Sequence, residues 1–185
     1  MTRAALLGTL SVLAALFALA PAASADSPWT PVPDPYTDVT IPANAWGGAC
    51  NFPILINTVA NSERQITTPV GPPAPSGTTL TRVRGNLVVS VSRLDDMGNP
   101  IKTIVRNSSG PTDTIAFPDG TGTETEKGNN STLAGPHSFA ATGEPVFFFT
   151  TGPVSLTFAT TSTGSRYLTS FNALKQESAC DLLAG

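Results

Sequence analysis

Histidine, cysteine and charged residues are scarce in this chain of 185 residues. One histidine, His137, and two cysteines are too few ligands for a zinc site, so we expect no metal. His137 stands in a turn-like context without a Gly-x-Ser-x-Gly elbow, which disfavours a Ser-His-Asp hydrolase. No run of ten residues has helical periodicity, so no glycine-rich loop precedes a helix to bind a phosphate, and we expect no cofactor.

Charged residues make up 12% of the chain, with 10 Lys and Arg against 13 Asp and Glu. They are scattered without a basic run, which argues against nucleic acid and against anionic membrane surfaces as partners. Beyond the N-terminus, no apolar stretch approaches the ~20 residues that span a bilayer, so we expect no transmembrane anchor. A cell-envelope glycan or protein remains open as a partner.

The first 25 residues have the pattern of a secretory signal peptide. Arg3 precedes an apolar stretch over residues 4–20, and Ala23-Ser24-Ala25 is a small-x-small cleavage site. We predict a secreted, extracellular protein whose mature chain begins at Asp26; the alternative is an uncleaved membrane anchor. The mature chain would have 185 − 25 = 160 residues, which is the length of one domain, with 9 basic and 13 acidic residues and a net charge of −4.

The two cysteines, Cys50 and Cys180, bracket almost all of the chain that carries a folding pattern. In an exported protein they most simply form one disulfide, and the alternative is two free thiols. The bond would tie the first apolar strand to the C-terminal end.

Short apolar and alternating segments separated by Gly- and Pro-rich turns predict an all-β fold. We expect a single antiparallel β-sandwich or squat barrel of about 8–10 strands, closed by the disulfide. The expected strands cover residues 51–59, 63–68, 78–84, 86–94, 101–105, 112–117, 145–151, 154–160 and 166–171. Residues 95–100 are expected to form a hairpin turn, residues 118–131 a polar loop, and Gly152-Pro153 a turn. Helix is expected only as a turn near residues 173–176 or beside Cys180.

Residues 26–48 are predicted to form a Pro-rich arm that precedes the β-domain of residues 49–185. Five prolines within residues 27–42 remove backbone donors and favour extended chain, with an edge strand at 37–41. Trp29, Tyr36 and Trp46 have two interpretations: an aromatic platform that binds carbohydrate, or anchors that pin the arm to a sheet.

The run Phe147-Phe148-Phe149 must face both sides of a sheet, because neighbouring strand residues point to opposite faces. We expect Phe147 and Phe149 between the sheets, near Leu156 or Phe158. Phe148 should be covered by the arm or by a loop.

Two close pairs of carboxylates are candidates for chemistry, Asp95-Asp96 and Glu124 with Glu126. The first lies at a hairpin tip, where Asp side chains usually satisfy turn backbone groups. Residues 119–126 lack the Asp-x-Asp-x-Asp-Gly spacing of a calcium loop, so we expect a solvated loop there. A set of arginines is expected to line one surface, which commonly only keeps a sheet face soluble: Arg82, Arg84 and Arg93.

Several short motifs follow one another in a familiar order: Cys50-Asn51-Phe52-Pro53, Gly85-Asn86-Leu87-Val88-Val89, Gly98-Asn99, Ile101-Lys102-Thr103-Ile104-Val105, Thr151-Gly152-Pro153-Val154-Ser155-Leu156 and Ala179-Cys180-Asp181-Leu182-Leu183. This order, over residues 49–183, resembles a group of secreted actinobacterial proteins of unknown function. Those proteins pair a cysteine in a Cys-x-Leu-Leu tail with one that precedes an early Phe-Pro strand. The resemblance implies a disulfide-closed β-domain and no particular activity.

Three functional hypotheses follow. The first is a non-enzymatic binding or structural protein at the cell envelope or outside the cell. The second is a carbohydrate-binding module, which requires at least two exposed, coplanar aromatic rings on one face. The third is a small secreted hydrolase, which requires a concave pocket with converging carboxylates, or His137 beside a hydroxyl group.

Overall fold

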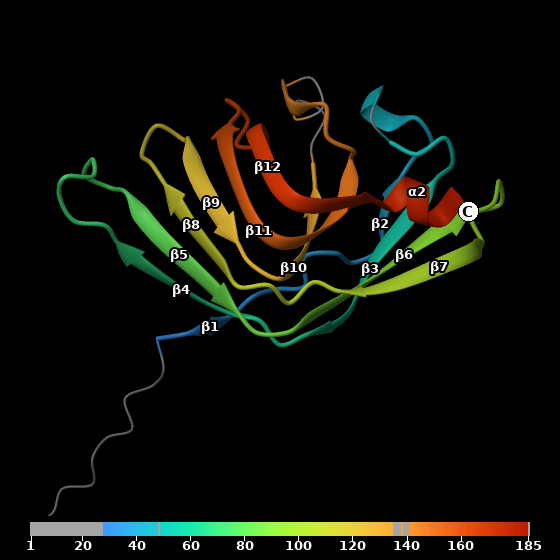
Figure 1. The fold of residues 1–185 in the computed structure, drawn as a ribbon, viewed down its shortest axis with the longest axis horizontal. Helices are drawn as coiled ribbons and strands as arrows, with labels where there is room; N and C mark the ends of the chain where they lie inside the picture. Colours follow the sequence, from blue (N-terminus) through green and yellow to red (C-terminus); the bar gives the residue numbers. More distant parts are fainter. Residues whose placement is uncertain (1–27, 48, 135–137, 139–140, 185) are drawn as a thin grey trace, which may run out of the picture.

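The computed structural model describes residues 28–184 except 48, 135–137, 139 and 140. The predicted signal peptide and His137 lie outside the described residues. The described chain forms two antiparallel sheets, which confirms the expected all-β sandwich (Figure 1).

The larger sheet has the order β1-β4-β5-β8-β9-β11-β10, and β12 pairs with the other side of β11. Its strands are β1 (Thr30–Pro31), β4 (Arg64–Pro69), β5 (Thr79–Arg84), β8 (Thr112–Ala116), β9 (Gly122–Glu126), β10 (Asn129–Leu133), β11 (Phe147–Thr160) and β12 (Arg166–Ser178). The smaller sheet has the order β2-β3-β6-β7. It consists of β2 (Val39–Ile41), β3 (Ile54–Asn61), β6 (Leu87–Leu94) and β7 (Pro100–Asn107). A 3₁₀ turn, η1 (Ala45–Gly47), and a short helix, α2 (Ala179–Ala184), complete the fold.

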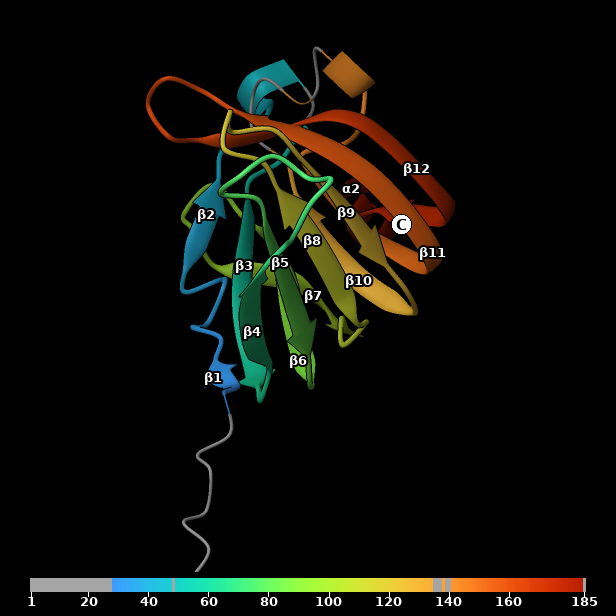
Figure 2. The same cartoon turned by 90° about the vertical axis from the view of Figure 1, so that its left-hand side faces the viewer.

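Strand β11 bends the larger sheet, because its two halves pair with different neighbours. Residues 147–151 pair with β10, whereas residues 154–158 pair with β9. Strand β12 follows β11 along both halves, and a register shift separates Thr151 from Val154. The predicted turn at Gly152-Pro153 was therefore wrong, and the two residues form a bulge within one strand. In Figure 2, β11 and β12 arch across the molecule as a result.

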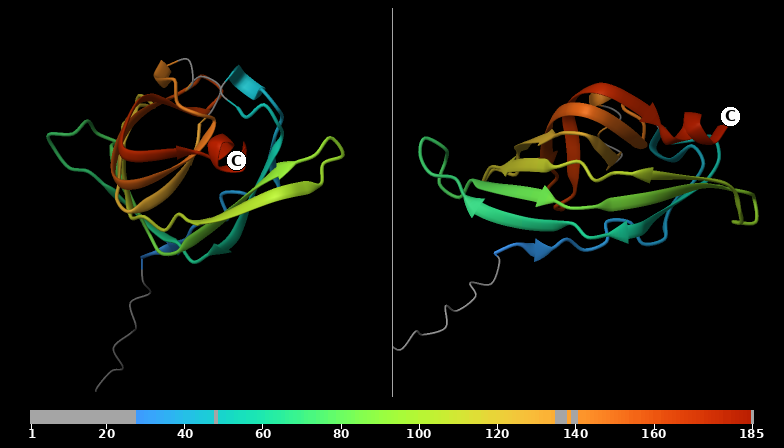
Figure 3. Two further views of the ribbon diagram at one scale, coloured as in Figure 1. Left: turned by 45° about the vertical axis from the view of Figure 1, so that its right-hand side comes forward. Right: turned by 60° about the horizontal axis from the view of Figure 1, so that its bottom comes forward.

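Two more sequence predictions were wrong in this sheet. The segment 118–131 holds most of β9 and β10 where a polar loop was expected. Strand β12 continues to Ser178, well beyond the predicted end at residue 171. Figure 3 shows the loop between β4 and β5 and the β6–β7 hairpin pointing to opposite ends of the molecule.

The core between the two sheets is built from aliphatic residues of β3 and β6 and from aromatic residues of β11. Phe147 and Phe149 both lie there and pack edge to face at 5.3 Å between ring centroids. Phe52, Ile54 and Ile56 are buried in this core, as the alternation in the first strand predicted. Burying such side chains contributes about 1.5–3 kcal/mol each.

Phe148 points to the opposite face of β11 and is fully buried in a second core. Its ring packs edge to face on Phe171 of β12, and Leu156 and Phe158 belong to this cluster. The expectation that those two residues adjoin Phe147 and Phe149 was therefore wrong. Leu156 and Phe158 lie an even number of residues from Phe148, as expected for side chains that share one face of a strand.

Part of the cover of the second core comes from the connection between β10 and β11. Ala134 belongs to the cluster, and the buried Ser138 accepts a hydrogen bond from the backbone of Leu168 at 2.7 Å. Phe148 is thus covered by residues of β11 and β12 together with Ala134 of this connection, and no residue of the arm belongs to the cluster.

The disulfide is present between Cys50 and Cys180, with the Cα atoms 5.1 Å apart. It fixes α2 to the segment before β3, and Leu183 of α2 is fully buried in the first core. The alternative of two free thiols is wrong, because both cysteines are bonded.

The Pro-rich arm runs along the edges of both sheets. Strand β1 pairs with β4, and β2 pairs with β3 within the predicted edge segment. Between them the backbone of Thr58 donates to the carbonyl of Tyr36 at 2.8 Å. The arm is therefore hydrogen-bonded to the edges of both sheets, and Tyr36 is held over the space between them.

Candidate functional site

The register of the larger sheet places two rows of side chains on its concave face. Glu126 of β9 lies opposite Thr112 of β8 and Val154 of β11. Glu124 lies opposite Thr114 and Leu156. Every second residue of a strand points to the same face, so Glu124 and Glu126 point to the same side of the sheet.

A cavity of about 400 Å³ lies on this concave face. A second hollow of about 220 Å³ adjoins it and shares five of its lining residues, Tyr36, Glu124, Glu126, Ser131 and Arg166. Exposed Pro35 and Arg166 belong to the lining, whereas Ser108 and Glu126 are buried. Small-molecule sites commonly occupy about 300–1,000 Å³.

The carboxyl groups of Glu126 and Glu124 interact with each other in this cavity. Burial, followed by the negative charge of Glu124, raises the pKa of Glu126 to about 8. At neutral pH the raised pKa favours the protonated form of the Glu126 carboxyl.

Arg166 of β12 fixes the Glu124 side of the pair. Its guanidinium donates to Glu124 Oε2 at 2.7 Å and lies over the ring of Phe158 at 3.7 Å. The hydroxyl of Thr114 donates to the same oxygen at 2.8 Å. Glu124 is thus held in place by two donors, one of which is the cation Arg166.

Glu126 has no comparable support, although it is only 5% exposed. Its Oε2 atom accepts no hydrogen bond from any described donor. The Thr150 hydroxyl lowers the pKa of Glu126 somewhat, but it makes no hydrogen bond of standard geometry with it. A buried acceptor left without a donor costs about 1–3 kcal/mol.

The opposite wall of the cavity carries further titratable and hydroxyl groups. Burial raises the pKa of Tyr36 to about 12, and the nearby Ser131 hydroxyl partly counteracts this. Burial also raises the pKa of Glu63. The hydroxyl of Ser108, a residue only 3% exposed, has no hydrogen-bond partner within the described chain.

The three aromatic residues singled out in the sequence have different placements. Tyr36 is 8% exposed, and its ring packs edge to face on Phe147 in the first core. Trp46 lies in η1 and is 47% exposed. Trp29 precedes β1, where its carbonyl accepts a hydrogen bond from Arg64. Tyr36 therefore serves as an anchor and a cavity wall, not as part of an exposed platform.

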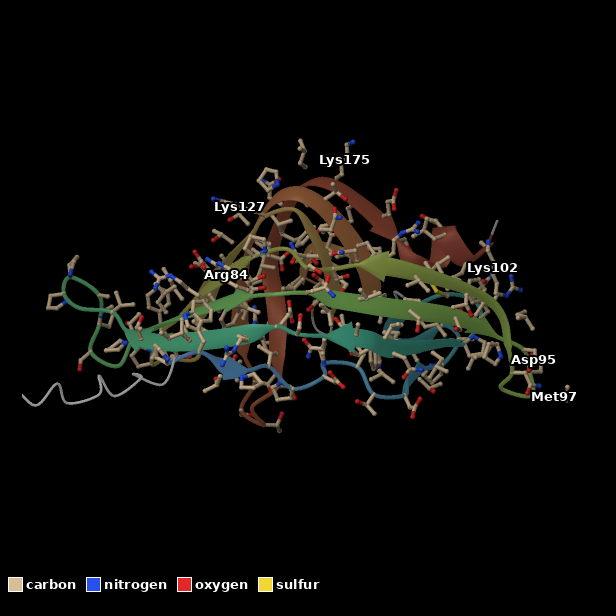
Figure 4. The ribbon with its side chains drawn as sticks, turned by 90° about the horizontal axis from the view of Figure 1, so that it is seen from below. Arg84, Asp95, Met97, Lys102, Lys127 and Lys175 are labelled. Atoms are coloured by element: carbon tan, nitrogen blue, oxygen red, sulfur yellow. A yellow bond between two sulfur atoms is a disulfide. The ribbon has the colours of Figure 1, made fainter. Side chains whose placement is uncertain are left out.

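The other candidates lie away from the cavity. Asp95 accepts hydrogen bonds from the backbone of Met97 and Asn99 at the β6–β7 tip, as expected for a turn carboxylate (Figure 4). Arg84 pairs with Asp113 outside the cavity-lining rows. Arg93 belongs to the smaller sheet and stacks on Phe52 at 4.4 Å, so the three arginines do not form one surface.

The sequence interpretation missed the cavity residues Glu63 and Arg166 and assigned Glu124 and Glu126 to a loop. The available signal was the alternation Gly122-Thr123-Glu124-Thr125-Glu126, which places both glutamates on one face of an extended strand.

No group of three or more His, Cys, Asp or Glu side chains within the described residues could hold a metal ion. None of the helices within them is long and apolar enough to cross a membrane.

Comparison with known proteins found no matching family model, no matching curated protein and no matching solved structure.

Proposed function

We propose that this chain is a non-catalytic binding protein that works outside the cell and holds a small polar molecule in the cavity of the larger sheet. The observation that carries the proposal is a set of three buried polar atoms of cavity-lining residues, Glu126 Oε2, Ser108 Oγ and Ser131 Oγ, which have no partner of standard geometry among the described residues. A ligand that supplies hydrogen bonds to these atoms removes the cost of burying them.

The extracellular setting is supported by the bond between Cys50 and Cys180, because disulfides persist in oxidising compartments. The signal-peptide pattern of residues 1–25 supports the same setting. We expect secreted material to have the intact mass of residues 26–185 with one disulfide. A mass that includes the first 25 residues would contradict secretion in soluble form.

A second candidate, hydrolysis by acid–base catalysis, is favoured by one observation: Glu124 and Glu126 converge in a cavity, where the pKa of Glu126 is raised. The geometry fits it less well than binding. Glycosidases keep their two carboxyl groups about 5–9.5 Å apart, with the reacting bond between them. Glu124 is instead held by Arg166 and Thr114, which leaves it less free to act on a substrate. Turnover of a chromogenic glycoside that is lost in Glu124→Gln would favour the enzyme over the binding protein.

The binding proposal is tested by NMR titration of the isotope-labelled protein with a panel of sugars, polyols, amino acids and polyamines. We expect at least one class to shift the resonances of residues that line the cavity. Thr112→Leu, which narrows the cavity beside Glu126, should abolish these shifts. Thr125→Leu, on the outer face of the neighbouring strand, should preserve them. Shifts confined to other surfaces, or none with the whole panel, would overturn the proposal.

A further inference from the structure

The charges around the cavity do not balance. Three carboxyl side chains line it, those of Glu63, Glu124 and Glu126, against one cation, Arg166. Arg166 is already engaged with Glu124 at 2.7 Å. The charge of Arg166 also lowers the pKa of Glu126, but with Glu126 ionised the lining would hold three negative charges against this one positive charge.

Glu126 is also placed to receive a donor. Its unpartnered Oε2 lines the cavity, and the residue is only 5% exposed. A hydrogen bond to a charged group is about twice as strong as a neutral one. The remainder of the lining is rich in hydroxyl groups, which both accept and donate: Tyr36, Thr81, Ser108, Thr112, Thr114 and Ser131.

On the basis of the binding function above, we propose that the ligand is a small organic cation: a primary amine that also carries hydroxyl groups, with its ammonium group against Glu126. A metal cation is disfavoured because no cluster of three ligating side chains exists in the described part of the chain. A compact ammonium with three donors suits one carboxylate oxygen surrounded by hydroxyl acceptors.

Binding should release the proton that the raised pKa of Glu126 favours in the free protein. The charged groups that face Glu126 are Glu124 from the same strand, Arg166 from β12 and Glu63 before β4, with Tyr36 from the arm. Of these groups only Arg166 carries a positive charge, and its guanidinium already forms an ion pair with Glu124. An incoming ammonium replaces the missing counter-charge, so Glu126 loses its proton when the ligand enters.

The test is calorimetric titration of the mature protein with glucamine and with sorbitol. The two differ in one group, an ammonium in place of a hydroxyl. We expect glucamine to bind about tenfold to a hundredfold more tightly than sorbitol, the range given by one charge-assisted hydrogen bond. Repeating the titration at pH 6.5 in phosphate and in HEPES, whose ionisation enthalpies differ, should show about one proton released.

Glu126→Gln keeps the size of the side chain and removes the charge, so glucamine should then bind no better than sorbitol. Asp96→Asn removes one exposed carboxylate at the β6–β7 tip and should leave the preference unchanged. Equal affinity for sorbitol and glucamine would overturn the cationic ligand while leaving polar binding in place. A preference that survives Glu126→Gln, or binding of neither compound, would overturn it as well. Failure of the binding function itself would show instead as an absence of cavity shifts with every class in the NMR panel.

Discussion

The buried carboxyl of Glu126 makes the stability of this protein depend on pH in an unusual direction. The pKa of Glu126 is raised from 4.5 to about 8 in the folded state, chiefly by burial. Between these values the folded state binds more protons than the unfolded state. The free energy of unfolding must therefore fall as pH rises from about 5 to 8. The contribution of a protonated Glu126 is fully present below the unfolded pKa and is lost as pH passes through the folded one.

The size of this effect follows from the shift. Each pKa unit corresponds to about 1.36 kcal/mol, and 8 − 4.5 = 3.5 units sets a ceiling of about 5 kcal/mol. Entry of water and relaxation of the cavity lower the cost of the charge, so we expect a loss of about 2–3 kcal/mol. Small domains have total stabilities of about 5–15 kcal/mol, so the loss is readily measured.

Glu126→Gln isolates the cause, because the amide cannot ionise. The variant should be as stable as the wild type near pH 5 and more stable by about 2–3 kcal/mol at pH 8. Glu63, whose pKa is also raised by burial, should leave a smaller slope of the same sign in the variant. Asp95 and Asp119 have lowered pKa values, so their contributions are lost only on the acid side of this range.

The measurement is urea unfolding followed by tryptophan fluorescence at half-unit steps from pH 5 to 8. Equal slopes of free energy against urea concentration at each pH would show that the same surface is exposed. Wild-type stability that is constant or rises over this range would refute the reasoning. So would a Glu126→Gln variant that keeps the full wild-type slope.

Three further changes test the fold. Cys50→Ala and Cys180→Ala should each lower the free energy of unfolding by about 2–5 kcal/mol. The double variant should lose no more than either single variant, because all three lack the same disulfide. Additive losses in urea unfolding would argue against this. Phe148→Ala should cost about 3–5 kcal/mol and Phe148→Ser more, because the side chain is fully buried, and an unchanged urea midpoint would place it outside the core. Gly85→Ala should cost more than ~1 kcal/mol, since φ is +136° and a Cβ would come within 2.6 Å of the turn before β4; Gly98→Ala, with φ +83° but open space, should cost less in the same assay.

The strands that could be predicted from the sequence are those with one apolar face. Residues 86–94 were expected as a strand, and β6 spans Leu87–Leu94 with Val89 and Val91 fully buried. In such strands the hydrophobic alternation reports burial directly. The disulfide was predictable for a different reason, since two cysteines allow only one pairing.

Strand β9 could not be found by this signal because neither of its faces contacts an apolar core over most of its length. One face carries Glu124 and Glu126 into a polar cavity, and the other carries Thr123 and Thr125 outward. Strand prediction from hydrophobic periodicity assumes that the inner face of the strand is apolar. A polar cavity removes that contrast, so β9 resembles a loop in the sequence, whereas β8 and β12, which also line the cavity, were expected as strands.

Gly152-Pro153 was read as a turn because proline removes a ladder donor and glycine allows a positive φ. In the structure Gly152 has φ +96°, and its N–H bonds to the carbonyl of Gly128 outside the regular ladder. The proline lies where β11 changes partner from β10 to β9, a place at which no ladder donor is needed. Which partner a strand has on each side is decided by segments distant in the chain, so local residue preferences do not contain it.

The sequence was sufficient to predict the role of one carboxylate pair but not that of the other. Asp95 and Asp96 are adjacent, and Asp95 is used by the backbone of its own turn. Glu124 and Glu126 are two residues apart, which in an extended chain brings both to one side at a separation that side chains can close. Spacing therefore distinguishes a carboxylate that completes a turn from a pair whose carboxyl groups can interact. Spacing does not determine whether the side of the strand that carries both glutamates faces water or a cavity. Here Tyr36, Arg166 and Glu63, which lie far from β9 in the chain, make it a cavity.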